Sequence, residues 1–151
     1  MRVITDVLVA AVISGGFTVY FESRLENSRE IASSLEDSQQ KFDVSHNQVI
    51  AKVGLYTNEL LDGHSKAKKE DILTAIINAQ SQLLELRAHL DKADYASIAA
   101  YGAQLNNLSE AVNTAAKGND LKPVFVAVQA LLIEHDDLSE RARKRAKVSL
   151  F

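Results

Sequence analysis

The chain has 151 residues, enough for one domain and at most one anchor, and its charged (25%) and hydrophobic (46%) fractions are those of an ordinary folded protein. The formal net charge of −3 gives no overall preference for nucleic acid, and the absence of cysteine excludes disulfides, thiolate zinc sites and cysteine nucleophiles. One proline, six glycines and an abundance of Ala, Leu, Gln, Glu and Lys predict an all-α protein.

Residues 3–21 form the first apolar segment, and Asp6 is its single charge. As a helix this segment would span about 28 Å, close to the thickness of a hydrocarbon core. Tyr20 and Phe21 stand at its edge, where aromatic side chains meet the membrane interface. We therefore predict a single-pass transmembrane anchor over residues 1–21, with membrane contacts from Val3, Leu8, Val12, Phe17, Tyr20 and Phe21.

Two other interpretations of this segment stay open. Arg2 and the Ser14-Gly15-Gly16 run also fit a cleaved signal peptide. The polar residues within the segment also fit a buried helix of a soluble bundle. The membrane side of the remaining chain is undetermined, because Arg2 favours an internal N-terminus whereas Arg24, Arg29 and the basic tail favour an internal domain.

The next stretch, residues 22–62, contains no proline and predicts one long helix. Its first part, residues 22–41, is poor in apolar residues and is expected to be a coiled-coil-like stalk. A stripe with alternating steps of three and four residues predicts the buried face: Ile31, Leu35, Ser38, Phe42, His46 or Ser45, Val49, Val53, Tyr56 and Leu60.

Three further helices are predicted between residue 64 and the basic end of the chain. Gly63 ends the long helix, Asp94 is expected to cap the third helix, and Pro123 falls in the first turn of the fourth. Short connections make neighbouring helices antiparallel, so residues 42–140 predict an antiparallel four-helix bundle. The expected buried faces are Ile72, Leu73, Ile76, Ile77, Leu83, Leu84, Leu86 and Leu90; Tyr95, Ile98, Tyr101 or Gly102, Leu105, Leu108 and Val112; and Val124, Phe125, Val128, Leu131, Leu132, His135 and Leu138.

The polar residues give no catalytic or metal-binding pattern. No two of the four histidines have a spacing of four residues, and the acids beside His135 splay around the helix instead of sharing its face. No glycine-rich phosphate loop occurs. We therefore expect a non-enzymatic protein without a metal or cofactor.

The basic tail, residues 141–151, is the sharpest local signal. Arg141, Arg143, Lys144, Arg145 and Lys147 are followed by an apolar end, Leu150-Phe151. Such a run fits a cationic last turn that complements the helix dipole, or contact with anionic lipid or a partner. Nucleic acid is disfavoured because no aromatic residue interleaves with the cations.

These features predict a membrane-tethered helical interaction or assembly protein, whose partners are membrane lipid and either another protein or itself through the stalk. A small-molecule sensor with a cavity near Tyr101, Gly102 and His135 is an alternative, as is a soluble bundle with residues 3–21 in its core. The anchor, the coiled stalk and the small size together resemble phage inner-membrane spanins, which implies a phage membrane protein as a further alternative. The outline also resembles the sensory domain of chemoreceptors, but their second transmembrane helix and signalling rod are missing here.

Overall fold

Four long helices make up the fold. In the computed structural model the chain forms α1 (Arg2–Leu61), α2 (Lys69–Arg87), α3 (Tyr95–Thr114) and α4 (Lys122–Val148), with the short 3-10 helix η1 (Lys92–Asp94) before α3. The structure describes the backbone of residues 2–62, 68–115 and 121–148, and within these ranges the side chains of residue 26 and of residues from 28 onward. No strand occurs in the described ranges, so the all-α prediction is confirmed.

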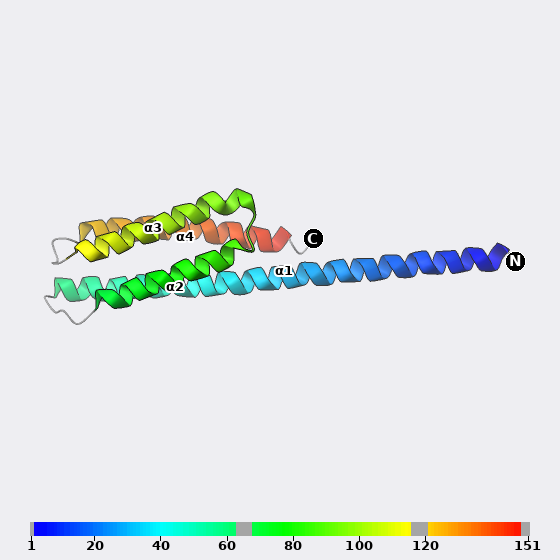
Figure 1. The fold of residues 1–151 in the computed structure, drawn as a ribbon, viewed down its shortest axis with the longest axis horizontal. Helices are drawn as coiled ribbons and strands as arrows, with labels where there is room; N and C mark the ends of the chain where they lie inside the picture. The colour runs from blue at the N-terminus through cyan, green and yellow to red at the C-terminus, as the bar shows by residue number, and fades with distance from the viewer. Residues whose placement is uncertain (1, 63–67, 116–120, 149–151) are drawn as a thin grey trace.

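The helices form an antiparallel bundle in which each reverses the direction of the one before it (Figure 1). Helix α1 packs against α2 and α4, and α3 packs against the same two helices, so the four surround one core. This is the up-down-up-down arrangement expected from short connections.

The core consists of one apolar stripe from each helix. On α1 the predicted stripe is buried at most of its positions, with Leu35, Phe42 and Val49 fully enclosed. On α3 the prediction is equally good, because Ile98, Tyr101, Leu105, Leu108 and Val112 are all buried. Full burial of a side chain of this size stabilises the fold by about 1.5–3 kcal/mol, so these stripes dominate the favourable free energy.

Five residues predicted to be buried are exposed: Ile31 of α1, and four residues that are each the second member of an apolar pair. Ile77 follows buried Ile76, Leu84 follows buried Leu83, Phe125 follows buried Val124, and Leu132 follows buried Leu131. Adjacent residues of an α-helix point about 100° apart, so only one member of each pair can face the core. The prediction of burial for Ile77, Leu84, Phe125 and Leu132 was therefore wrong.

Among the described side chains of α1, the first buried one is Ala32, inside the segment 22–41 that was expected to be a stalk. Leu35, Ser38 and Gln39 are also buried, whereas Ile31 is exposed. Helix α4 continues beyond the expected boundary at residue 140, and Ala142 and Ala146 in its last turns are buried. Of the predicted stalk, the described side chains that precede the first buried residue are those of residue 26 and residues 28–31.

The N-terminal half of α1 continues past the end of the bundle as the same helix (Figure 1). Within the part of the chain whose side chains are described, no helix is long and apolar enough to cross a membrane. The predicted anchor contacts Val3, Leu8, Val12, Phe17, Tyr20 and Phe21 lie outside the described side chains. The anchor therefore stays a prediction.

The helix ends agree only in part with the expected signals. Pro123 lies in the first turn of α4, where its missing N–H removes no helical hydrogen bond. Asp94 occupies the position before α3, but its side chain makes no capping hydrogen bond and instead faces Arg141 of α4. The stop signal at Gly63 lies outside the described residues.

Gly54 is expected to be replaceable with a gain in stability. It lies on an exposed side of α1, and a Cβ added there would meet nothing within 4 Å. Because glycine loses more backbone entropy than alanine on entering a helix, Gly54→Ala should raise the free energy of unfolding by about 0.5–1 kcal/mol. Urea unfolding followed by circular dichroism measures the change. A loss of stability would contradict the open helical environment assigned to this residue.

Candidate functional site

A polar and aromatic cluster lies at the centre of the bundle, where α1, α3 and α4 meet. It combines two histidines, a carboxylate, two aromatic rings and a hydroxyl. Its members are Phe42, Asp43 and His46 of α1, Tyr101 of α3, and His135 and Ser139 of α4.

His46 and Tyr101 form the innermost part of this cluster. His46 Nδ1 and the Tyr101 hydroxyl are hydrogen-bonded at 3.0 Å, and both side chains are buried. Burial, with the neighbouring His135 adding to the effect, lowers the pKa of His46 to about 4. Burial also raises the pKa of Tyr101, with Asp43 adding to the effect. Both groups are therefore neutral at neutral pH, as a weakly solvated site requires.

His135 links α4 to α1 at the edge of the cluster. Its Nε2 lies 2.9 Å from Asp43 Oδ1, and the Ser139 hydroxyl donates to the same oxygen at 3.1 Å. The His135 ring stacks on His46 with centroids 3.8 Å apart and planes 16° apart. Phe42 lies against His135 and meets Tyr101 edge-on. The cluster thus fixes the register of three helices relative to one another.

A serine, a histidine and a carboxylate meet here, but not in the geometry that activates a nucleophile. Ser139 Oγ lies 3.4 Å from His135 Nε2, and Asp43 contacts that same nitrogen. In a nucleophilic triad the carboxylate binds one ring nitrogen and the hydroxyl binds the other. The arrangement is therefore suited to holding helices together.

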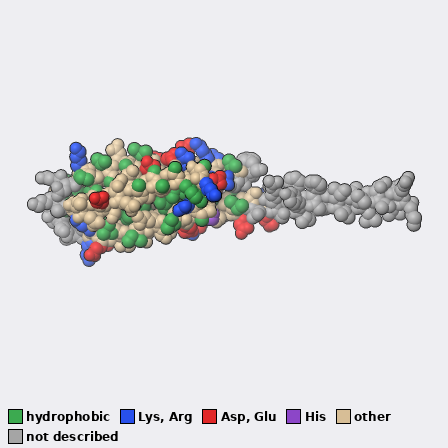
Figure 2. Space-filling view, turned by 45° about the horizontal axis from the view of Figure 1, so that its top comes forward, with side chains coloured by type: hydrophobic (Ala, Val, Ile, Leu, Met, Phe, Trp, Pro, Cys, Tyr) green, Lys and Arg blue, Asp and Glu red, His purple; other side chains and the backbone are tan. Residues whose placement is uncertain are grey.

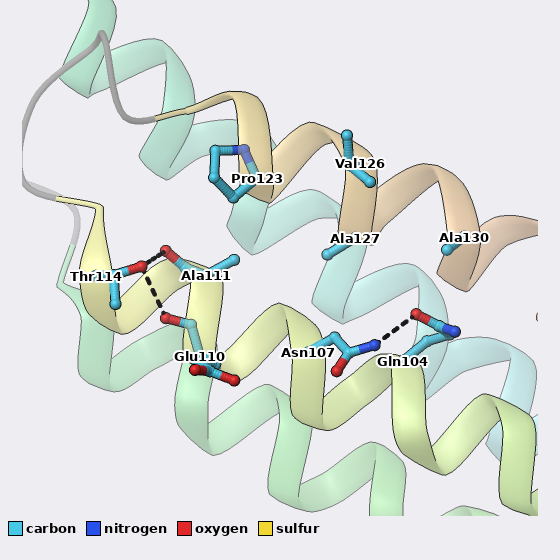
Figure 3. Close-up of a pocket in the computed structure, with 9 residues that line it drawn as sticks. All are labelled: Gln104, Asn107, Glu110, Ala111, Thr114, Pro123, Val126, Ala127 and Ala130. Atoms are coloured by element: carbon cyan, nitrogen blue, oxygen red, sulfur yellow. Dashed lines mark hydrogen bonds between the residues drawn. The ribbon is translucent and has the colours of Figure 1, made fainter.

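At the place where a ligand cavity was predicted, Tyr101 and His46 pack against each other. Tyr101 is fully buried, and a Cβ added to Gly102 would already lie 3.6 Å from Leu83 Cδ2. The described surface has open grooves. One of about 360 Å³ runs between α3 and α4, with Asn107 and Gln104 on one wall and Ala127 and Ala130 on the other (Figure 3).

The basic run of α4 divides into cations that pair within the fold and cations that do not. Charges of both signs intermix near the end of the bundle from which α1 projects (Figure 2). Arg141 pairs with Asp137 at 2.8 Å and with Asp94 at 3.5 Å, and Arg145 pairs with Asp91 at 2.9 Å.

Lys144 pairs with Glu140 on its own helix at 2.6 Å. Arg143 and Lys147 are exposed, and within the described ranges neither has an ion pair. The bond from Arg141 holds the pKa of Asp137 below its usual range, and Ser97, which donates to Asp137 at 2.7 Å, adds to this.

Asp91 and Asp94 were not recognised from the sequence as partners of the basic run. They precede α3 by only a few residues, and nothing local indicates that α4 returns beside them. Their ion pairs tie the last turns of α4 to the connection between α2 and α3. Three of the five predicted lipid or partner contacts therefore form ion pairs within the chain: Arg141, Lys144 and Arg145.

No group of three or more His, Cys, Asp or Glu side chains among the described residues is arranged to hold a metal ion. The chain matches no protein-family model, no curated protein and no solved structure in the three comparisons made. Inference about function therefore rests on the geometry described above.

Proposed function

We propose that this chain is a non-enzymatic, membrane-tethered helical interaction protein. The observation that supports it is the length of α1, which is one continuous helix from Arg2 to Leu61, and among its described side chains the first buried one is Ala32. A helix that continues far beyond its own core needs another environment for its apolar part. The apolar sequence of residues 3–21 has the length that a bilayer requires.

The geometry of α1 also sets how far the bundle would stand from the membrane. Residues 22–31 lie between the predicted anchor and the first buried residue, and as a helix they span about 15 Å. Because His135 and Ser139 lie opposite Asp43 and α4 runs antiparallel to α1, the end of α4 near Val148 lies level with Ala32. The basic run would then face the membrane from roughly one and a half to two and a half Debye lengths at 0.1 M salt.

Deleting residues 2–21 tests the tether. The full chain should sediment with membranes and require detergent for extraction, whereas the shortened chain should be soluble and keep its helical circular dichroism spectrum. A reporter fused at the C-terminus would show the side of the membrane. If the shortened chain unfolds or aggregates while the full chain is soluble without detergent, residues 3–21 belong to the core and the proposal fails.

The cations that have no ion pair in the fold should carry any preference for anionic lipid. We expect the shortened chain to bind anionic vesicles more strongly than neutral ones, and Arg143→Gln with Lys147→Gln to remove the difference, because each cation near an anionic surface adds up to about 1 kcal/mol. Arg141→Gln with Arg145→Gln is the matched control, and it should lower stability while preserving the preference. Equal binding to both vesicle types would show that the run only terminates α4.

A further inference from the structure

Helix α4 presents a second apolar face, directed away from the core. Phe125, Val126, Leu132 and Ile133 are 51%, 58%, 42% and 62% exposed. Together with exposed Gln129 they follow helical spacing over about two turns, so they lie on one side of the helix. We call Phe125, Val126, Gln129, Leu132 and Ile133 the outer α4 face.

The polar residues at the two ends of this face have opposite charges. Lys122 lies one turn before Phe125 and is exposed, and Asp136 lies one turn after Ile133 with its side chain 88% exposed. Within the described ranges Lys122 has no ion pair, and Asp136 has only the nearby His135 at 3.6 Å. Single exposed apolar residues are normal, but a contiguous apolar stripe with charged ends marks a protein interface.

The sequence of the outer α4 face is complementary to itself in the antiparallel direction. With Gln129 on a two-fold axis, Phe125 meets Ile133 of a second copy and Val126 meets its Leu132. The same register places Lys122 against Asp136 of the second copy, twice by symmetry. A parallel pairing would instead place like charges together at both ends. We propose that a second copy of this chain covers the outer α4 face, forming a two-fold antiparallel α4 pair.

This pairing rests on the interaction role proposed above and names the partner, a second copy of the chain. It also determines where the two predicted anchors would lie relative to each other. Gln129 lies level with about Val49 of α1, because His135 lies opposite Asp43. The two copies of α1 would leave the pair from opposite ends, each extending about 40 Å from that level to residue 22. With the anchors of the proposed function, the pair would hold two bilayers roughly 80 Å apart.

Single cysteines test the register, because the natural chain has none. In the full chain, kept in mild detergent where it is needed for solubility, oxidised Gln129→Cys should form a covalent dimer. Phe125→Cys and Ile133→Cys should each form no disulfide-linked dimer alone. They should cross-link only when the two variants are mixed, and a tag on one of them identifies the mixed dimer by its size. Ser81→Cys on the exposed side of α2 is the control. Self-linking of Phe125→Cys and Ile133→Cys without mixed dimers would overturn the antiparallel register.

Charge and polarity changes test the affinity. Lys122→Glu should weaken dimerisation by about tenfold across the two symmetric pairs, and adding Asp136→Lys should restore it. Ile133→Glu should give a monomer, and at concentrations where the natural chain is also monomeric the two should have the same melting temperature, since Ile133 is exposed in the single chain. A chain that sediments as a monomer at all concentrations, with the outer α4 face bound instead to lipid or to another protein, would overturn the proposal.

Vesicle clustering separates this proposal from the tether. Full chain in two vesicle populations should cluster them, and Ile133→Glu should abolish clustering without releasing the protein from vesicles. Cross-linked dimers in a chain that does not float with vesicles would leave the pairing intact and refute the tether. A chain that binds vesicles but forms no cross-links would leave the tether intact and refute the pairing.

Discussion

Leu131→Ala is expected to lower the free energy of unfolding by about 2–5 kcal/mol, whereas Leu132→Ala should cost less than about 1 kcal/mol. The two residues are neighbours of the same type on α4, but Leu131 is fully buried and Leu132 is 42% exposed. Truncating Leu131 removes buried apolar surface and leaves a cavity, while truncating Leu132 removes surface already in contact with water.

Chemical unfolding measures the stability of both variants. A low protein concentration keeps the chain monomeric, so that no second copy covers the outer α4 face. The pair controls for helix propensity, because both substitutions replace leucine by alanine in the same turn of the same helix. Equal losses for the two variants would mean that α4 is rotated relative to the core, and the assignment of its outer α4 face would be wrong.

Acidification should destabilise the fold through His46. Its pKa in the fold is about 4, below the ordinary value of 6.5, so the unfolded chain binds the proton more readily. The stability associated with neutral His46 is fully present above pH 6.5 and is lost as the pH falls from 6.5 to 4. The shift corresponds to a loss on the order of 3 kcal/mol at pH 4.

The charged and titratable groups facing His46 come from α1, α3 and α4, namely Asp43, Tyr101, His135 and Asp136. His46→Asn isolates the contribution of His46, because asparagine places a polar atom near the position of Nδ1 and does not titrate. Between pH 7 and pH 4 the natural chain should lose more stability than this variant. Parallel pH curves for the two would refute the assignment of the effect to His46.

The periodicity of the sequence predicts the bundle well because burial repeats with the helical period. The stripe through Leu35, Phe42 and Val49 identifies the buried face of α1 without any knowledge of its neighbours. Where two apolar residues are adjacent, as in Ile76-Ile77, the sequence does not say which faces inward. That choice depends on the rotation of the helix in the bundle, which only tertiary packing determines.

The start of the bundle and the polar cluster could not be predicted from local sequence. Gln39 lies in the segment that was expected to be a solvated stalk, yet it is buried. His46 and Tyr101 are 55 positions apart in sequence, and Asp43 and His135 are 92 apart. Such contacts depend on how far each helix is shifted along its axis relative to its neighbours. The periodicity of the sequence does not determine this shift.

Hydrogen exchange along α1 of the full chain bound to vesicles tests the central claim most directly. A tether followed by a bundle predicts two protected segments, residues 3–21 in the bilayer and residues 32–61 in the core. Faster exchange over residues 22–31 should separate them, and protection of residues 3–21 should be lost when lipid and detergent are absent. Protection of residues 3–21 that is the same with and without lipid would contradict the tether, because the segment would then be buried by protein.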